Sequence, residues 1–207
     1  MSRLSLSSSL WEDALTLRDY VAGMTQHQRG MIHRLSYVEL RPDERAFFKK
    51  MDHVRYVLVM NEDWCGDGVL NLPIISKIVQ AMPRAELKIV YRTGQDDLNA
   101  HYTARGVTHL PVVTFFDDDG AELATWEEHP AMGTTLFEEW KASQPEFLAI
   151  RYATDIDEET RSQKLKPFYR QLLQEMFTWY DGERNLQKAT VDEIHELLAA
   201  DSSGSLI

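Results

Sequence analysis

The residue best suited to chemistry is Cys65, the only cysteine in a chain of 207 residues. It follows Trp64 and precedes Gly66, directly after an apolar run. The thiolate is the reactive form of cysteine, and it is stabilised at a helix N-terminus, where unpaired N–H groups and the positive end of the helix dipole converge. The segment therefore predicts a nucleophilic thiol if a helix begins just after Cys65.

The flanking residues predict a strand before Cys65 and a helix after it. Residues 54–60 form an apolar run rich in Val and broken only by Arg55, which is typical of a strand buried on both faces. From residue 69 to residue 79 apolar side chains recur at helical spacing, with Pro73 expected to kink the helix and Met82-Pro83 to end it. Residues 86–91 read as the next strand, which should lie parallel to the first.

The elements downstream follow from similar signals. A helix is expected over 96–105, capped by Asp96 or Asp97 and stopped by Gly106. An extended approach through Pro111 leads into a strand ending at 116, and the acidic turn at 117–120 joins it to a strand over 122–126. A helix over about 134–142 completes this region.

The two ends of the chain read as helical. Ser9 and Glu12 have capping-box spacing before one apolar helical face that extends to residue 24, and Pro42 opens a second helix to about residue 50. Pro167 indicates a helix start, and Thr190 with Glu193 forms another capping box. Residues 1–8 and the tail from 201 are expected to be disordered.

The Trp64-Cys65-Gly66 segment at a strand-to-helix junction resembles the active-site turn of the thioredoxin superfamily. With Glu62, Asp63 and Asp67 it is most similar to a bacterial branch that continues Trp-Cys-Gly-Asp-Cys. Pro111, 46 residues after Cys65, stands where the family has a cis-proline facing the cysteine.

The resemblance covers about residues 42–142 and implies an α/β, thioredoxin-like fold. Its βαβ–α–ββα core is a central mixed sheet flanked by helices. Helical additions are expected at both ends of a single domain over residues 1–207: N-terminal helices over about 9–50 and a C-terminal extension over about 146–200.

The resemblance also implies roles for individual residues. Cys65 would be the nucleophile, and the substrate-binding residues would be Trp64, Gly66, Asp67, Leu110 and Pro111. The family's second cysteine is replaced by Gly68, so an external thiol, glutathione or another low-molecular-weight thiol, would have to resolve the mixed disulfide.

Two functions follow from these residues. The first is a cytoplasmic monothiol oxidoreductase acting on protein disulfides or low-molecular-weight thiols. The alternative is a redox-inactive module that binds a protein partner through Trp64 and Pro111. A cysteine at position 68 is expected to restore a dithiol.

Local charge predicts a weakly activated thiol. The carboxylates of Glu62, Asp63 and Asp67 should raise the pKa of Cys65 about as much as the helix terminus lowers it, which leaves an expected pKa of about 7.5–8.5, close to the free value of ~8.5. Val59 also stands where the family usually has a buried acid.

Composition excludes several classes of partner. The net charge of −11 argues against nucleic acid and against an anionic membrane surface. No apolar run approaches the ~20 residues of a membrane span, the N-terminal segment lacks signal-peptide features, and one cysteine suits a reducing cytoplasm. The seven histidines have no ligand spacing, so neither a metal nor a bound cofactor is expected. The sequence does not specify the oligomeric state.

Overall fold

The structure, a computed structural model, describes the backbone of residues 3–204 and the side chains of residues 3–200. The chain forms two compact units, one holding residues up to Glu128 together with those from Thr190 onward, and the other holding residues 129–189. In chain order the elements are α1 (Ser8–Asp13), β1 (Leu15–Thr16), α2 (Leu17–Gly23), α3 (Gln28–Tyr37), α4 (Pro42–Phe48), β2 (Tyr56–Asn61), α5 (Gly66–Ala81), β3 (Glu86–Tyr91), α6 (Asp96–Ala104), β4 (Val112–Phe116), β5 (Glu122–Glu127), α7 (Ala131–Ser143), α8 (Pro145–Arg151), α9 (Glu158–Asp181) and α10 (Leu186–Gly204).

The first unit is built on a five-stranded mixed sheet with strand order β1-β3-β2-β4-β5. Strand β2 lies at its centre and pairs in parallel with β3 and antiparallel with β4, so that Val59 lies between Ile89 and Val113. The predicted parallel βαβ unit and the mixed sheet are therefore confirmed. Strand β2 runs one residue further than predicted and ends on Asn61.

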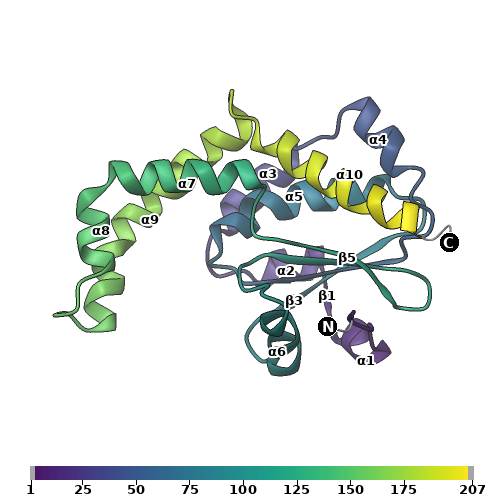
Figure 1. Ribbon diagram of the computed structural model, residues 1–207, viewed down its shortest axis with the longest axis horizontal. Coiled ribbons are helices and arrows are strands. Elements are labelled where there is room, and N and C mark those ends of the chain that lie inside the picture. Colours follow the sequence, from purple (N-terminus) through teal and green to yellow (C-terminus); the bar gives the residue numbers. More distant parts are fainter. Residues whose placement is uncertain (1–2, 205–207) are drawn as a thin grey trace. The chain divides into compact units, whose positions relative to one another are not determined.

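Helix α6 lies on one face of the sheet and helix α5 on the other (Figure 1), and successive residues of β2 point to opposite faces. Leu58 and Met60 pack in one cluster with Leu98 and Tyr102 of α6, and Cys65 belongs to the same cluster. Helix α5 covers the other face and packs against α3 and α4. Its residues from 68 to 76 are all buried, because neighbours surround the helix.

The predicted single helix from residue 9 to residue 24 is wrong. Ala14 is extended, and Leu15 and Thr16 pair antiparallel with Ile89 and Lys88 at the edge of β3. The Thr16 side chain then accepts a hydrogen bond from the N–H of Asp19 and caps α2. Pairing with an open strand edge thus interrupts the apolar helical pattern, and α2 ends at Gly23.

The segment before α1 is ordered, against expectation. The N–H of Leu6 donates to Gly120 O, the N–H of Glu122 donates to Leu4 O, and Ser5 forms an isolated bridge with Ala121. Residues 3–6 therefore lie beside the β4–β5 turn and the start of β5. Residues 1–2, also expected to be disordered, lie outside the described residues.

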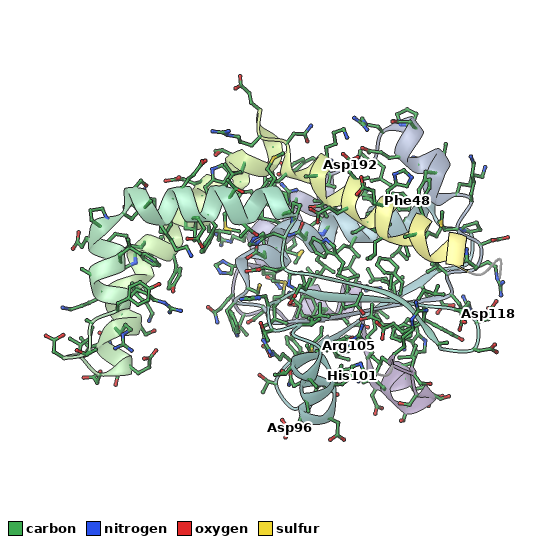
Figure 2. The ribbon with its side chains drawn as sticks, viewed as in Figure 1. Phe48, Asp96, His101, Arg105, Asp118 and Asp192 are labelled. Carbon is green, nitrogen blue, oxygen red and sulfur yellow. The ribbon has the colours of Figure 1, made fainter. Side chains whose placement is uncertain are left out.

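Arg105, just after α6, ties that helix to β5 (labelled in Figure 2). Its guanidinium donates two hydrogen bonds of 2.6 Å to the carboxylate of Glu122, whose side chain is 2% exposed. The same carboxylate accepts from the N–H of Leu4 and from the Thr125 hydroxyl. Burial alone raises the pKa of Glu122, but the bonds from Arg105, Leu4 and Thr125 outweigh it and hold that pKa below its usual range.

Helices α4 and α6 form where they were predicted, and only the N-cap of α6 differs. Helix α6 begins at Asp96, but its N-cap is Gln95 rather than an aspartate. Pro42 is the first residue of α4, as predicted.

The C-terminal additions are helical, with boundaries that differ from those predicted. Pro167 lies inside α9 rather than near its start, and α8 was not predicted. Thr190 lies within α10 instead of capping it; it is buried, and its hydroxyl donates to Asn71 Oδ1 at 2.9 Å. Helix α10 continues to residue 204, where disorder was expected, and residues 205–207 lie outside the described part.

The second unit contains α7, α8 and α9 around an aromatic cluster. The ring of Phe147 lies 5.1 Å from that of Trp140 and 5.8 Å from those of Phe168 and Tyr169. Across the described residues, no helix is both long enough and apolar enough to span a membrane.

Candidate functional site

Cys65 is the N-cap of α5, as predicted, with an extended backbone conformation. Its sulfur accepts a hydrogen bond from the N–H of Gly68 at 3.4 Å, and its S–H donates to the carbonyl oxygen of Leu110 at 3.4 Å. The residue is only 7% exposed. The sulfur is thus enclosed between the first turn of α5 and the segment that leads into β4.

Burial raises the pKa of Cys65 to about 12. That value includes the charges of Asp67 and Glu128, which also raise the pKa, and the N–H groups of Gly68 and Asp67, which lower it. The expected pKa of about 7.5–8.5 is therefore wrong, because the sequence does not reveal how completely the thiol is removed from water. At pH 7 the sulfur is almost entirely in the neutral thiol form.

Glu62 and Asp63 hold the loop before Cys65 in place. Glu62 Oε1 accepts two bonds of 2.7 Å from the N–H and hydroxyl of Thr93. Asp63 Oδ2 accepts from the N–H and hydroxyl of Thr25 and from the N–H of Gln26. Burial by itself raises the pKa of Asp63, but these bonds outweigh it and lower that pKa. Both carboxylates, expected to act on the sulfur, are instead structural anchors.

Trp64 is held at the surface by these anchored neighbours. Its side chain is 55% exposed, whereas Glu62, Asp63 and Cys65 are all buried. Gly66 begins α5 and is partly buried. A large aromatic side chain that packs so little on its own protein is available for contact with a partner.

The Leu110–Pro111 peptide bond is cis, as predicted. The Leu110 carbonyl accepts from the Cys65 thiol, and Pro111 O accepts from the N–H of Glu128 at 2.8 Å. Within residues 3–204, the backbone N–H of Leu110 has no hydrogen-bond acceptor. Cys65, Leu110 and Pro111 are therefore brought together as the resemblance implied.

Glu128 belongs to the site although the sequence did not indicate it. It has a left-handed conformation, with φ 62°, which is uncommon for a residue other than glycine. Asn71 Nδ2 donates to Glu128 O and to Asp67 O, both at 3.1 Å, and so ties the end of β5 to the start of α5. Carboxylate oxygens of Asp67 and Glu128 lie within 4.8 Å of one another.

Asn61 occupies the space that a second cysteine would need. A Cβ built on Gly68 would lie 2.3 Å from Asn61 Nδ2 and 2.5 Å from Asn61 Oδ1. Asn61 is 1% exposed, and its Nδ2 donates to the hydroxyl of buried Tyr20 at 2.9 Å. A cysteine at position 68 therefore needs a second change to be accommodated. In the sequence, the only indication of this obstruction is that a polar residue, Asn61, ends an otherwise apolar strand.

Solved structures with the same fold include the following two. A protein of unknown function from Pseudomonas aeruginosa is 15% identical, with a TM-score of 0.59 over 95% of this chain and 99% of its own. An HIV epitope-scaffold is also 15% identical, with a TM-score of 0.59 over 93% of this chain and 97% of its own. At this identity the likeness concerns the fold alone.

Comparison by sequence identifies the family. No curated protein matches the chain. A family model described as thioredoxin matches residues 14–141, which is more than half of the chain and includes the whole sheet. The sheet topology, the cysteine at the start of α5 and the cis-proline before β4 agree with that match. The chain therefore belongs to the thioredoxin family.

Proposed function

We propose that this thioredoxin-like protein binds an extended segment of a partner protein at a surface formed by Trp64, Asp67, Leu110 and Pro111, the Trp64 surface. In this proposal Cys65 is a neutral, structural thiol. The observation that carries the proposal is the enclosed Cys65 thiol, which donates to the Leu110 carbonyl and has a pKa raised to about 12.

The enclosed position of Cys65 and the obstructed position 68 are unfavourable for thiol–disulfide exchange. The reaction requires a thiolate that reaches a substrate disulfide, and a second thiol that releases the product. Here burial keeps the sulfur in its neutral thiol form at pH 7, and the residue is 7% exposed. The position of the second thiol is a glycine whose surroundings are filled by Asn61.

The features that remain are suited to docking. An extended segment that adds to backbone beside a strand needs free backbone hydrogen-bonding groups, and the N–H of Leu110 is one. Trp64 supplies a large aromatic contact, and tryptophan is among the residues most often responsible for binding energy at interfaces. Because the anchors at Glu62 and Asp63 fix the loop, little ordering should be needed on binding.

One observation favours the other function, monothiol exchange. The N–H of Gly68 points at the sulfur, as it would to stabilise a thiolate. In that reaction the Cys65 thiolate would attack a protein or glutathione disulfide, form a mixed disulfide and release one thiolate. An external thiol such as glutathione would then break the mixed disulfide and leave Cys65 reduced.

Oxidised glutathione separates the two functions. The folded protein is incubated with it at pH 7.5, and the intact mass is measured, with Cys65→Ser as the blank. We expect no glutathione adduct on the folded protein and a full adduct once denaturant exposes the thiol. A stoichiometric adduct on the folded protein within minutes would refute the proposal and support monothiol exchange.

A further inference from the structure

We propose that the second unit has a binding face of its own, the Tyr169 face, formed by Arg151, Tyr152, Lys166, Tyr169 and Arg170. Its occupant is a short acidic segment of another protein. This inference goes beyond the proposed docking function, because these residues all lie within the unit of residues 129–189 and none belongs to the Trp64 surface.

Two aromatic side chains are exposed on this face. Tyr152, which follows the last turn of α8, is 72% exposed, and Tyr169 of α9 is 42% exposed. The Arg151 guanidinium donates to the Tyr169 hydroxyl at 3.4 Å, so the end of α8 lies beside α9. The Tyr169 ring also contacts that of Phe147 in the aromatic cluster, which fixes its position. Exposed tyrosine next to arginine is typical of surfaces that contact a partner protein.

The charges of α9 are separated along the helix. Residues 160–174 contain four basic side chains and no acidic one, the basic ones being Arg161, Lys164, Lys166 and Arg170. Arg161 is paired with Glu158 at 2.6 Å. Among the residues that the structure describes, the other three form no ion pair, and neither does Arg151. In a chain of net charge −11 this stretch is therefore a local positive surface.

Helical spacing places these cations around Tyr169. Lys166, Tyr169 and Arg170 stand at positions i, i+3 and i+4 of α9, which are neighbours on one helix face, and all three are exposed. Arg151 reaches the same place from α8 through its bond to Tyr169. Three cations from two helices therefore surround one exposed aromatic ring, and no carboxylate in the described part of the chain neutralises them.

A short acidic segment fits this face better than other anions do. The two arginines can each bind a carboxylate through a pair of parallel hydrogen bonds, and Lys166 adds a point charge. The rings of Tyr152 and Tyr169 provide apolar contact for a residue between the acidic ones. Nucleic acid and an anionic membrane extend beyond the face and would bring their charge against a chain of net charge −11. The charge of a short segment stays within about one Debye length, ~8 Å, of the three cations.

A displayed library of random decapeptides provides the test. It is selected against the full-length protein in 150 mM salt, and peptides that also bind the variant Lys166→Gln with Arg170→Gln are removed. We expect the remaining peptides to carry Asp or Glu on both sides of an apolar residue. Replacing their acidic residues by the corresponding amides should weaken binding at least tenfold, because the carboxylates are the groups that the cations bind.

Matched protein variants assign the effect to the Tyr169 face. Lys166→Gln with Arg170→Gln should weaken the selected peptides at least tenfold, and glutamine keeps the helix propensity of the residues that it replaces. Arg29→Gln with Lys49→Gln removes the same two charges from exposed positions of the first unit and should change affinity less than twofold. Thermal unfolding of each variant checks that it is folded.

The outcomes distinguish this face from the Trp64 surface and from other occupants. Trp64→Ala should leave the selected peptides bound with unchanged affinity, and a loss of their binding in that variant would overturn the inference. Oligothymidylate and phosphatidylserine vesicles are measured alongside the peptides; if either binds more tightly, and does so through Lys166 and Arg170, the occupant is not an acidic protein segment. If no peptide remains after removal of those that bind the variant, or if those that remain lack acidic residues, the inference is wrong.

Discussion

Replacing Gly68 by cysteine tests how the chain accommodates the lack of a second thiol. The new Cβ would lie 2.3 Å from Asn61 Nδ2, which is 1.1 Å (3.4 − 2.3) short of the distance at which ordinary contact begins. Asn61 is buried and bonded to Tyr20, so it has to move and give up that bond. Overpacking costs ~1–3 kcal/mol and an unsatisfied buried hydroxyl a similar amount, so we expect a loss of roughly 2–5 kcal/mol in unfolding free energy.

A double-mutant cycle isolates the clash. Asn61→Ala alone should cost ~1–3 kcal/mol, because it leaves the buried Tyr20 hydroxyl without its partner. Adding Gly68→Cys to Asn61→Ala should then cost little, giving a coupling of roughly 2–5 kcal/mol between the two positions, equal to the cost of Gly68→Cys alone. Urea unfolding under reducing conditions measures all four proteins. Gly23→Ala serves as the control, since its Cβ would meet only Tyr91 Oη at 3.6 Å.

Oxidation provides the second readout. With diamide, the double variant should form an intramolecular disulfide between positions 65 and 68, and Gly68→Cys alone should not. A cost of Gly68→Cys below about 1 kcal/mol, or effects of the two substitutions that simply add, would show that Asn61 does not obstruct a side chain at position 68.

Three further predictions concern titration and the loop anchors. The rate of iodoacetamide alkylation of folded Cys65 should rise steadily up to pH 10, and Asp67→Asn should lower the pKa of Cys65 by up to about one unit; a rate plateau below pH 8 would contradict this. Glu122→Gln should cost ~1–3 kcal/mol at pH 7. Because the folded pKa of Glu122 lies below the unfolded value of ~4.3, this contribution is present above pH 4.3 and disappears as pH falls through the folded pKa, which urea midpoints from pH 2 to 7 will show. Asp63→Asn should speed hydrogen exchange at the Thr25 and Gln26 amides at least tenfold while leaving the amides of β2 unchanged.

The centre of the fold could be predicted because its signals are local. The apolar run of β2, the helical spacing in α5 and the spacing between Cys65 and Pro111 each lie in a short stretch of sequence or in one interval. Strand β1 could not be predicted in this way, since two residues carry no periodicity. It forms because the edge of β3 is open to Leu15 and Thr16.

The site was predictable only in part, for a similar reason. Cys65 and Pro111 carry recognisable types and spacing, whereas Asn61 and Glu128 matter because of what the fold brings beside them. The predicted pKa of Cys65 was wrong because the charged residues near it can be counted in the sequence, whereas the burial of its sulfur cannot be read from the sequence. The capping role predicted for Thr190 was wrong although the local signal was present. Its spacing to Glu193 fits a capping box, but Thr190 lies within α10 and its hydroxyl donates to Asn71.

The pairing of residues 3–6 with the start of β5 has a consequence for synthesis on the ribosome. Leu4 bonds to Glu122, a residue 118 positions later, so the earliest described segment waits until nearly the whole sheet has emerged before it finds its partner. Contacts so distant in sequence close slowly. Until they close, the start of β5 presents an unpaired edge of the kind that recruits other chains. Nascent molecules should therefore be most prone to associate in that interval, and the pairing of these four residues with the start of β5 brings it to an end.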